Sequence, residues 1–472
     1  MQQTHPIQKA KNIYHLFQSV YANYKYDFPA RDLKVLGVTG TDGKTTTTMM
    51  LYHVLKNSGL NVGYISTTGA KIGDKDLDTG LHVTTPDPWM VPKYLRQMVE
   101  EGITHVVLES TSNGLQQNRL WGVGFDGGII TNIKSDHLDY HGSWENYAKA
   151  KFELVMKLKP KTTLVINKED EKSYNWLKGN ISKERLNINV EEVDKSKVDN
   201  VEFSVKGIKY DFLGQKFELP IIGKYNLENS IGAILLLKEF VSLENISEHL
   251  KTFSPPKGRM EVIQTEPFTV IIDFAHTPNS LESALKSLRE MKKSDQKIIT
   301  VFGCAAMRDK ERRKMGEVSA RLSDVTILTA EDPRDEKLFD VNNEILEYAK
   351  KSKAQLLQRF NDSEKYKIGK LEVIKSEITK ITEEGFAPFF AFDADDITSR
   401  KDAISLAIRI ADKGDIVYLT GKAHEESLAF GADQVEYPWS EHEVVKEALK
   451  KLDQQVPQRN NNPKNKTCFN SK

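Results

Sequence analysis

A glycine-rich loop between an apolar run and a helix-like segment limits the fold of this sequence more than any other feature. The loop reads Gly40-Thr41-Asp42-Gly43-Lys44-Thr45-Thr46. A predicted buried strand at residues 34–39 (KVLGVT) precedes it, and a predicted helix at residues 45–57 follows it. Such a loop points backbone N–H groups and a lysine at phosphate, and its threonine hydroxyl suits a Mg²⁺ ion. Val38 stands where the strict pattern has glycine, so the loop is a variant, and an ordinary glycine turn is the alternative.

Strand-like and helix-like segments alternate after this loop and again later in the chain. Strands are predicted at residues 62–66, 105–109, 127–131, 163–166, 269–273, 297–302, 325–329 and 415–420. Helices are predicted at residues 89–101, 143–158, 227–240, 280–291, 312–322 and 400–411. This alternation predicts an α/β protein with parallel sheets covered by helices, whereas the polar stretch at 185–220 predicts a small antiparallel excursion. The expected fold is a central P-loop-type parallel-sheet domain followed by a Rossmann-like C-terminal α/β domain.

The length and punctuation of the chain predict several parts. A chain of 472 residues is too long for one compact core, and Pro255-Pro256 marks a boundary. We expect a short N-terminal helical segment (1–33), a central domain (34–254), a C-terminal domain (255–453) and a disordered tail (454–472).

Five residues of the N-terminal segment follow one helical face and predict that it packs on the central domain. They are Ile13, Leu16, Phe17, Val20 and Tyr21. The alternative is a helix that presents tyrosines to a partner protein or a membrane surface, namely Tyr14, Tyr21, Tyr24 and Tyr26.

Composition excludes some classes of protein. Lys+Arg and Asp+Glu both number 67, so the chain has no general attraction to nucleic acid or membranes, and anionic ligands must be held by local charge. Two cysteines, Cys304 and Cys468, do not make a disulfide framework. The sequence has neither a signal-peptide pattern nor an apolar run of membrane-spanning length. We therefore expect a cytoplasmic, monomeric protein.

Ten further motifs accompany the loop, and together they resemble the Mur ligase family. They are TTPDP (84–88), LESTSNGLQQNR (108–119), TNIKSDHLDYHG (131–142), YAKAK (147–151), GKYNLEN (223–229), GRME (258–261), DFAHTPN (273–279), RDK (308–310), EDPR (331–334) and GKAHE (421–425). Several are typical of the E-type members, the UDP-N-acetylmuramoyl-tripeptide synthetases of peptidoglycan synthesis.

The resemblance implies an ATP-dependent ligase. In this family ATP phosphorylates a carboxylate, an amine attacks the acyl-phosphate, and phosphate leaves; charge neutralisation and positioning supply most of the catalysis. The implied substrates are ATP, UDP-N-acetylmuramoyl-L-alanyl-D-glutamate and an amino acid, with Mg²⁺ as the metal. A diamino acid is expected, and meso-diaminopimelate is the first choice because Arg334 and Arg308 are suited to gripping carboxylates.

The resemblance also assigns residues. The catalytic set is Lys44, Glu109, His137 and Lys151, and the metal set is Thr45, Glu109, His137 and Lys151, the last if carbamylated. The ATP set is Gly40, Thr41, Asp42, Gly43, Lys44, Thr45, Thr46, Asn226, Asn229, Arg259, Asp273 and His276; N-capping is the alternative for Asn226. The acceptor set is Thr84, Thr85, Thr111, Gln117 and Arg119. The amino-acid set is Arg308, Asp332, Arg334, Gly421 and Glu425.

The chain departs from the family pattern at several positions. Asp42 and Asn113 replace a usual Asn and His, Ala305-Ala306-Met307 replaces Gly-Gly-Asp, Ala423 replaces Gly, and Glu331-Asp332 replaces Asp-Asn. Residues 345–392 exceed the family's equivalent. Only about 33 residues precede the central domain, so the usual uridine-binding domain is expected to be absent and the uridine to contribute little to binding.

Two other functions stay open. One is a Mur-type ligase that acts on another carboxylate, such as a folate, a polypeptide or lipid-linked peptidoglycan. The other is a catalytically idle nucleotide-binding scaffold, which the retained metal-ligand positions disfavour.

Overall fold

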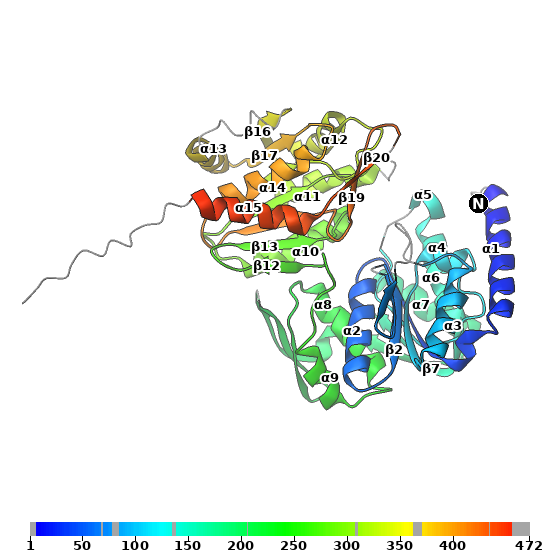
Figure 1. The fold of residues 1–472 in the computed structure, drawn as a ribbon. Helices are drawn as coiled ribbons and strands as arrows, with labels where there is room; N and C mark the ends of the chain where they lie inside the picture. The colour runs from blue at the N-terminus through cyan, green and yellow to red at the C-terminus, as the bar shows by residue number, and fades with distance from the viewer. Residues whose placement is uncertain are drawn as a thin grey trace, which may run out of the picture. The chain divides into compact units, whose positions relative to one another are not determined.

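The protein folds into two compact units (Figure 1). A computed structural model describes residues 6–67, 69–77, 85–134, 138–204, 206–306, 310–361, 371–433 and 435–455. The first unit comprises Met1–Glu261, Thr277–Lys293 and Asp309–Glu311, and the second comprises the remaining segments, Val262–His276, Ser294–Arg308 and Arg312–Lys472. Of the tail expected to be disordered, 454–472, the first two residues belong to a helix that ends at Gln455, and the residues from 456 onward lie outside the described residues.

An eight-stranded sheet of order β4-β3-β2-β5-β1-β6-β7-β8 forms the centre of the first unit. Its strands are β1 (Lys34–Thr39), β2 (Val62–Ser66), β3 (Gly69–Ile72), β4 (Lys75–Leu77), β5 (His105–Glu109), β6 (Phe125–Ile130), β7 (Leu158–Asn167) and β8 (Asn189–Val193). All strands from β2 to β8 in this order pair in parallel, while β3 and β4 form an antiparallel extension. Because the carboxyl ends of parallel strands meet at one edge, the segments that follow β1, β5 and β6 lie together.

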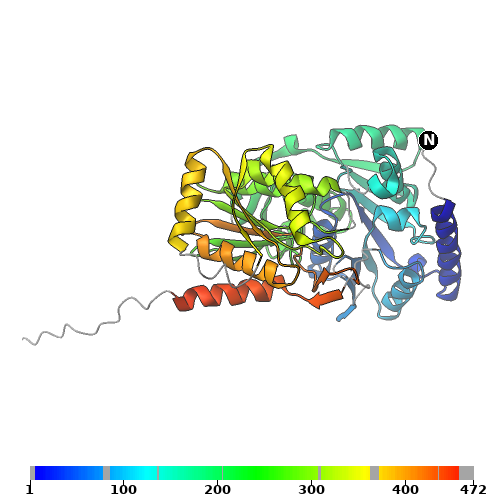
Figure 2. The same cartoon turned by 90° about the horizontal axis from the view of Figure 1, so that it is seen from above.

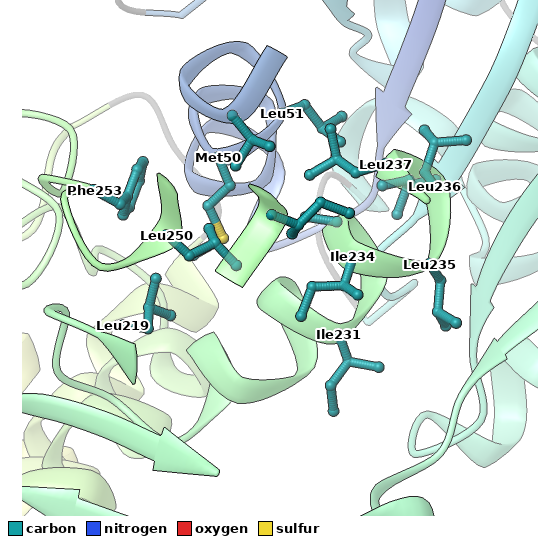
Figure 3. Packing of buried hydrophobic residues seen from close by; sticks show 14 of the residues in the cluster. Met50, Leu51, Leu219, Ile231, Ile234, Leu235, Leu236, Leu237, Leu250 and Phe253 are labelled. Atoms are coloured by element: carbon teal, nitrogen blue, oxygen red, sulfur yellow. The ribbon is translucent and has the colours of Figure 1, made fainter. Parts of the chain in front are cut away.

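Helices cover both faces of this sheet. They are α2 (Lys44–Asn57), α3 (Met90–Glu100), α4 (Ser112–Gln116), α5 (Leu138–His141), α6 (Trp144–Met156), α7 (Glu171–Glu184), α8 (Tyr225–Leu237) and α9 (Leu243–Leu250), with the short 3-10 turns η1 (Pro29–Asp32) and η2 (Lys195–Lys197). Alternate residues of β1 point to opposite faces, so Leu36 packs under α2 and α8 while Val35 packs against α3. Figure 3 shows the first of these cores, with Met50 and Leu51 of α2 beside Ile234 of α8.

The antiparallel excursion expected at 185–220 is present as a three-stranded sheet. Its strands are β9 (Val198–Ser204), β10 (Gly207–Phe212) and β11 (Gln215–Leu219). However, β8 lies in the same stretch and joins the main sheet in parallel with β7.

The N-terminal helix α1 (Pro6–Lys25) is present, but its predicted packing face is wrong. Ile13, Phe17, Val20 and Tyr21 are exposed and Leu16 is only partly buried. The buried side chains are the small or polar ones of Ser19, Ala22 and Asn23. Helical periodicity correctly separates an apolar face from a polar face of α1. Polar contacts with the central domain turn the polar face inward, so the apolar face lies outside.

A seven-stranded sheet of order β12-β13-β18-β14-β15-β17-β16 organises the C-terminal half. Its strands are β12 (Glu261–Gln264), β13 (Thr269–Asp273), β14 (Ile298–Phe302), β15 (Val325–Leu328), β16 (Ala354–Phe360), β17 (Ala387–Phe392) and β18 (Ile416–Thr420), and β19 (Ser427–Phe430) pairs separately with β20 (Val435–Pro438). The helical elements are α10 (Pro278–Met291), η3 (Lys310–Lys314), α11 (Met315–Leu322), α12 (Leu338–Lys350), α13 (Leu371–Glu383), α14 (Thr398–Ile410) and α15 (Glu441–Gln455). From β13 to β16 the pairing is parallel, which confirms the Rossmann-like expectation.

The described part of the chain contains no helix that is long and apolar enough to cross a membrane.

Candidate active site

The phosphate loop follows β1 and turns directly into α2. Gly43 is the residue before the helix and has a φ of 81°, a left-handed conformation that suits glycine. A Cβ at this position would lie 2.3 Å from Oδ1 of Asn229, so glycine also lets α8 approach the loop closely. Lys44 begins α2, and its ammonium donates to the carbonyl of Thr41 at 2.8 Å. The loop therefore presents a helix N-terminus and a lysine at the carboxyl edge of the sheet.

The segment after β6 braces this loop. Asn132 accepts from the Asp42 N–H at 2.9 Å and donates to the Asp42 carbonyl at 3.1 Å, while the Thr131 hydroxyl donates to the same carbonyl at 2.6 Å. Lys134 lies 3.7 Å from the Asp42 carboxylate. This ion pair offsets the negative charge that Asp42 brings to a loop built for anions.

Glu109 is buried at the end of β5 and faces the loop from the neighbouring strand. Its Oε1 accepts from the hydroxyls of Thr45 at 3.0 Å and Thr67 at 2.9 Å, and its Oε2 accepts from the Thr67 N–H at 3.1 Å. A carboxylate beside a hydroxyl forms the hard oxygen donor set that Mg²⁺ prefers. Thr67 completes this cluster, although the sequence gave no reason to select it.

The side chain of Lys151, from α6, extends to the phosphate loop at the same carboxyl edge of the sheet. Its side chain is 1% exposed, its ammonium donates to the Gly40 carbonyl at 2.6 Å, and it lies 4.4 Å from the centre of the Tyr147 ring. Lys151 is therefore buried at the site and is not a solvated lysine on the surface of a helix. His137 lies outside the described residues, and within those residues no three His, Cys, Asp or Glu side chains are grouped to hold a metal.

Asn226 and Asn229 are buried in the first two turns of α8. The Asn229 amide donates to Oδ1 of Asn226 at 2.9 Å, and the Asn226 amide donates to the Ile222 carbonyl at 2.7 Å. Asn226 thus bonds backward to the preceding loop, so the N-capping alternative for it is wrong. The pair instead fixes the Asn229 side chain against Gly43.

Four residues of the expected acceptor set form one hydrogen-bonded cluster, in which Thr85 comes from the segment before α3 and the other three follow β5. The Thr85 and Thr111 hydroxyls lie 3.0 Å apart, and Thr111 also caps α4 by accepting from the Gly114 N–H at 3.0 Å. Arg119 donates to the Thr85 carbonyl at 2.8 Å and to Oε1 of Gln117 at 2.9 Å. Burial lowers the pKa of Arg119, although the group stays a cation at neutral pH. Thr84 lies outside the described residues.

Short helix α5 adds two residues that the sequence analysis did not select. Tyr140 accepts at its hydroxyl from the Gln117 amide at 2.9 Å. His141 is buried, and its Nε2 lies 3.0 Å from the Ser112 hydroxyl. Both belong to the motif TNIKSDHLDYHG, so the signal that could have found them was the motif itself.

In the second unit, the motifs EDPR and GKAHE meet at the carboxyl ends of β15 and β18. The fully buried Lys422 donates to both carboxylate oxygens of Asp332, at 3.0 and 3.1 Å, and pairs with Glu425 at 2.6 Å. Asp332 also accepts from the Ala429 N–H at 3.0 Å. Lys422 was not in the expected set, yet it links two of its members. Arg308 lies outside the described residues.

Glu331 lies beside this pair and is buried. Burial raises the pKa of its carboxyl to about 8, against the opposing effect of nearby cations such as Arg312. Among the described residues none bonds to its Oε2, and a Cβ at Gly421 would lie 2.5 Å from that oxygen. Arg334, with a φ of 51°, continues the motif and donates its N–H to the Ala429 carbonyl at 3.1 Å.

Arg400 of α14 connects the two motifs from behind and was also missed. Its guanidinium donates to the carbonyls of Ala330 at 3.0 Å and Thr420 at 2.9 Å, the residues just before Glu331 and Gly421. Glu441 holds it by two further bonds, at 2.9 and 2.6 Å, and neither side chain is exposed. Nothing in an arginine of the first helical turn distinguishes this role in the sequence.

The remaining ATP-set residues lie apart from these clusters in the chain. Asp273 ends β13 and accepts from the buried Tyr418 hydroxyl at 2.7 Å, and His276 Nδ1 lies 2.7 Å from the Phe274 carbonyl. Arg259 is half-buried in the segment between α9 and β12, where its N–H donates to the Pro256 carbonyl at 3.0 Å.

Two family models match the chain over these same regions. The Mur ligase middle domain matches residues 38–237, and the Mur ligase glutamate ligase domain matches residues 258–365. A curated relative from Clostridium acetobutylicum, named UDP-N-acetylmuramoyl-L-alanyl-D-glutamate–2,6-diaminopimelate ligase 1, is 33% identical over 440 residues, which are 91% of this chain and 81% of the relative. The chain belongs to the Mur ligase family.

A further curated relative supports this membership, and two solved structures share the fold. A 2,6-diaminopimelate ligase of the same name from Clostridium tetani is 31% identical over 94% of this chain and 83% of its own length. A solved structure of such a diaminopimelate ligase superposes with a TM-score of 0.57 at 24% identity, over 89% of this chain and 79% of that one. Escherichia coli FolC in complex with ADP gives a TM-score of 0.62 at 15% identity, over 93% of both chains. The family, the α/β fold and the ligase class expected from the sequence are thus confirmed.

Proposed function

We propose that this Mur ligase is a cytoplasmic, ATP-dependent enzyme that adds a diamino acid to UDP-N-acetylmuramoyl-L-alanyl-D-glutamate during synthesis of peptidoglycan precursors. The observation that carries the proposal is the meeting of two groups at one sheet edge. The phosphate loop with Lys44 follows β1. Glu109 ends the adjacent strand β5, and the acceptor cluster around Thr111 lies just beyond that end. A triphosphate and an acceptor carboxylate held there would lie close enough to react.

The first half-reaction transfers a phosphoryl group. An oxygen of the acceptor carboxylate attacks the γ-phosphorus, a C–O–P linkage forms, the bond to the β-phosphate oxygen breaks, and ADP leaves. Lys44 and the N–H groups at the start of α2 would hold the phosphates and offset the charge that develops on them. Thr45 and Glu109 fit a Mg²⁺ ion by their donor atoms, and when bound this ion would neutralise phosphate charge. His137 and a carbamylated Lys151 would hold a second one.

The second half-reaction forms the amide. The amine attacks the acyl carbon, the C–N bond forms, the C–O bond to phosphate breaks, and phosphate and a proton leave. Thr85, Thr111, Gln117 and Arg119 would orient the acceptor for this attack, because their mutual hydrogen bonds leave them little freedom to rearrange.

The charges of the second unit favour a distal carboxylate on the incoming amino acid. Lys422 donates to Asp332 and also pairs with Glu425, so the acid that replaces the family asparagine is already held by a cation of the protein. Glu331 holds its proton at neutral pH, since its pKa is raised to about 8. Arg334 then supplies the cation, and a forked guanidinium pairs well with a carboxylate. Meso-diaminopimelate carries this carboxylate and lysine does not.

The test is a panel of amino acids with ATP and UDP-N-acetylmuramoyl-L-alanyl-D-glutamate, read by the mass of the product. We expect the diaminopimelate adduct, with a higher kcat/KM than for lysine. Arg334→Gln should lower kcat/KM for diaminopimelate by about 10- to 150-fold, the equivalent of one charged hydrogen bond of about 1.5–3 kcal/mol, and leave lysine addition unchanged. A higher kcat/KM for lysine would refute the diaminopimelate assignment, and absence of any adduct would refute the proposed function.

A further inference from the structure

Helix α1 carries its large apolar side chains on the outside. Ile13 is 56% exposed, Tyr14 61%, Phe17 69%, Tyr21 62% and Tyr24 76%, and Val20 is also exposed. Their positions recur at spacings of three and four residues, so they form one continuous stripe, named here the outer face of α1. Contiguous exposed apolar surface on a protein marks a place that binds something.

The opposite face of α1 is polar and is fixed to the central domain. The Ser19 hydroxyl donates to the Asn118 carbonyl at 2.7 Å, and the Asn23 amide donates to the Trp121 carbonyl at 2.8 Å. This polarity is the reverse of an ordinary surface helix, whose apolar side packs inward. In both views α1 lies at the periphery of the first unit (Figures 1 and 2). The hydrogen bonds therefore hold the helix in an orientation that keeps its apolar side outward.

The charge of α1 identifies what this face fits. Between Pro6 and Lys25 the helix has three lysines, Lys9, Lys11 and Lys25, and no aspartate or glutamate. Lys11 and Lys25 are exposed. The nearest following acid, Asp27, lies 3.6 Å from Arg96. A second copy of α1 would bring like charges together without an acidic partner, whereas helical pairs are normally joined by opposite charges along the seam.

Basic helices with an aromatic outer face are typical of binding in the headgroup region of anionic membranes. Tyrosine has an apolar ring and a polar hydroxyl, which suits this boundary, and each lysine near an anionic surface adds to the attraction. The outer face extends beyond the helix, because Tyr21 stacks on Trp89 with ring centres 5.7 Å apart and the Lys25 ammonium lies 4.8 Å from the same ring.

We infer that α1 is an interfacial helix that docks this protein on the surface of an anionic lipid bilayer, with Phe17, Tyr21 and Tyr24 in the headgroup region and Lys11 and Lys25 at lipid phosphates. The interaction is peripheral and needs no membrane-spanning segment. It does not depend on which amino acid or acceptor the enzyme uses.

The experiment is co-sedimentation of the full chain with vesicles of phosphatidylcholine alone or with about one third phosphatidylglycerol. We expect binding to the anionic vesicles, weakened by salt because the attraction is partly electrostatic. Phe17→Ser with Tyr21→Ser should reduce the partition coefficient at least tenfold, and so should replacement of Lys9, Lys11 and Lys25 by Gln. Val373→Ser with Phe386→Ser, two exposed apolar residues elsewhere, is the matched control and should bind as the unmodified chain does.

Three outcomes would overturn the inference. The first is equal binding, or none, to the two kinds of vesicle. The second is unchanged binding by the Phe17→Ser, Tyr21→Ser variant. The third is self-association of the unmodified chain that this variant abolishes, which would make the outer face an interface between copies. Circular dichroism of the variant, together with its ATP-dependent ligation in the absence of lipid, should match the unmodified chain, because the outer face has no part in the proposed active site.

Discussion

The ion pair between Arg400 and Glu441 offers a stringent test of how the second unit is held together. Replacing Arg400 with Met removes the guanidinium but keeps most of the side-chain volume. Among the described residues, the Trp439 indole at 2.9 Å is then the one side-chain donor left to the buried Glu441, and the carbonyls of Ala330 and Thr420 lose their bonds to Arg400. We expect a large loss of stability confined to the second unit.

The magnitude follows from the burial of both charges. Neither side chain is exposed, and removal of one partner from a buried pair costs about 3–5 kcal/mol. With a urea dependence of about 2 kcal/mol per M, the unfolding midpoint should fall by roughly 2 M. The double variant Arg400→Met, Glu441→Leu should recover part of this loss, because it removes the unpaired charge.

The chain provides its own reporter and its own control for this measurement. Trp439 is the tryptophan of the second unit, since the other four of the five fall in the first, so a background with those four replaced by Phe reports on the second unit alone. Lys401 is the control, because its ammonium joins the same two helices by pairing with Glu447 at 2.9 Å, but both side chains are about half exposed. Lys401→Met should cost less than about 1 kcal/mol.

The reasoning is refuted if Arg400→Met lowers the unfolding free energy by no more than Lys401→Met does. A second readout concerns function, because Arg400 holds the residues before Glu331 and Gly421. Arg400→Lys should raise KM for the amino acid and leave KM for ATP unchanged. A lower kcat with both KM values unchanged would show a general loss of folded enzyme instead of a displaced amino-acid site.

Three further predictions concern single residues. Lys44→Ala should abolish amide formation while the circular dichroism spectrum is retained, and normal turnover by the folded variant would contradict the phosphate-loop assignment. Lys151→Ala should lower activity, and added short carboxylates should restore part of it; full activity without rescue would show that carbamylation has no catalytic part. Glu331 binds its proton more tightly in the folded protein, where its pKa is raised from 4.5 to about 8. Between these two pH values the unfolded chain binds fewer protons than the folded one, so the free energy of unfolding falls as pH rises, by about 1.4 kcal/mol per pH unit at most. Glu331→Gln should remove this contribution when urea unfolding is compared at about pH 5 and pH 8, and an unchanged pH dependence would show that Glu331 is ionised in the folded protein.

Much of the fold follows from local sequence pattern. The strands predicted at residues 34–39, 62–66, 105–109 and 269–273 coincide with β1, β2, β5 and β13. These strands are buried on both faces, so each one is a mostly apolar run in the sequence. Glycine, polar residues or loops mark the two ends of each run. The phosphate loop was equally clear, since its residues are contiguous. Residues 345–392 were not assigned, and they contain the end of α12 followed by β16, α13 and β17.

The contacts that depend on tertiary structure were not predictable. Periodicity in α1 shows that the helix has two faces, but the carbonyls of Asn118 and Trp121 decide which one turns inward. Arg400 and Lys422 each look like solvated residues until the ends of β15 and β18 are brought together. Motif resemblance located Asp332 and Glu425, because both lie within short motifs. Lys422 lies in the same motif as Glu425, but only the folded structure shows that it joins the two acids, and Arg400 lies outside every motif.

The most direct test of the acyl-phosphate ligase follows one oxygen atom. UDP-N-acetylmuramoyl-L-alanyl-D-glutamate labelled with oxygen-18 in the reacting carboxylate is incubated with ATP, meso-diaminopimelate and the enzyme, and the phosphate released is analysed by mass spectrometry. If the carboxylate attacks the γ-phosphorus and the amine then displaces phosphate, each amide formed delivers one labelled oxygen to phosphate. The account predicts labelled phosphate in a one-to-one ratio with the amide product. Amide formation with unlabelled phosphate, or phosphate release without amide, would contradict it.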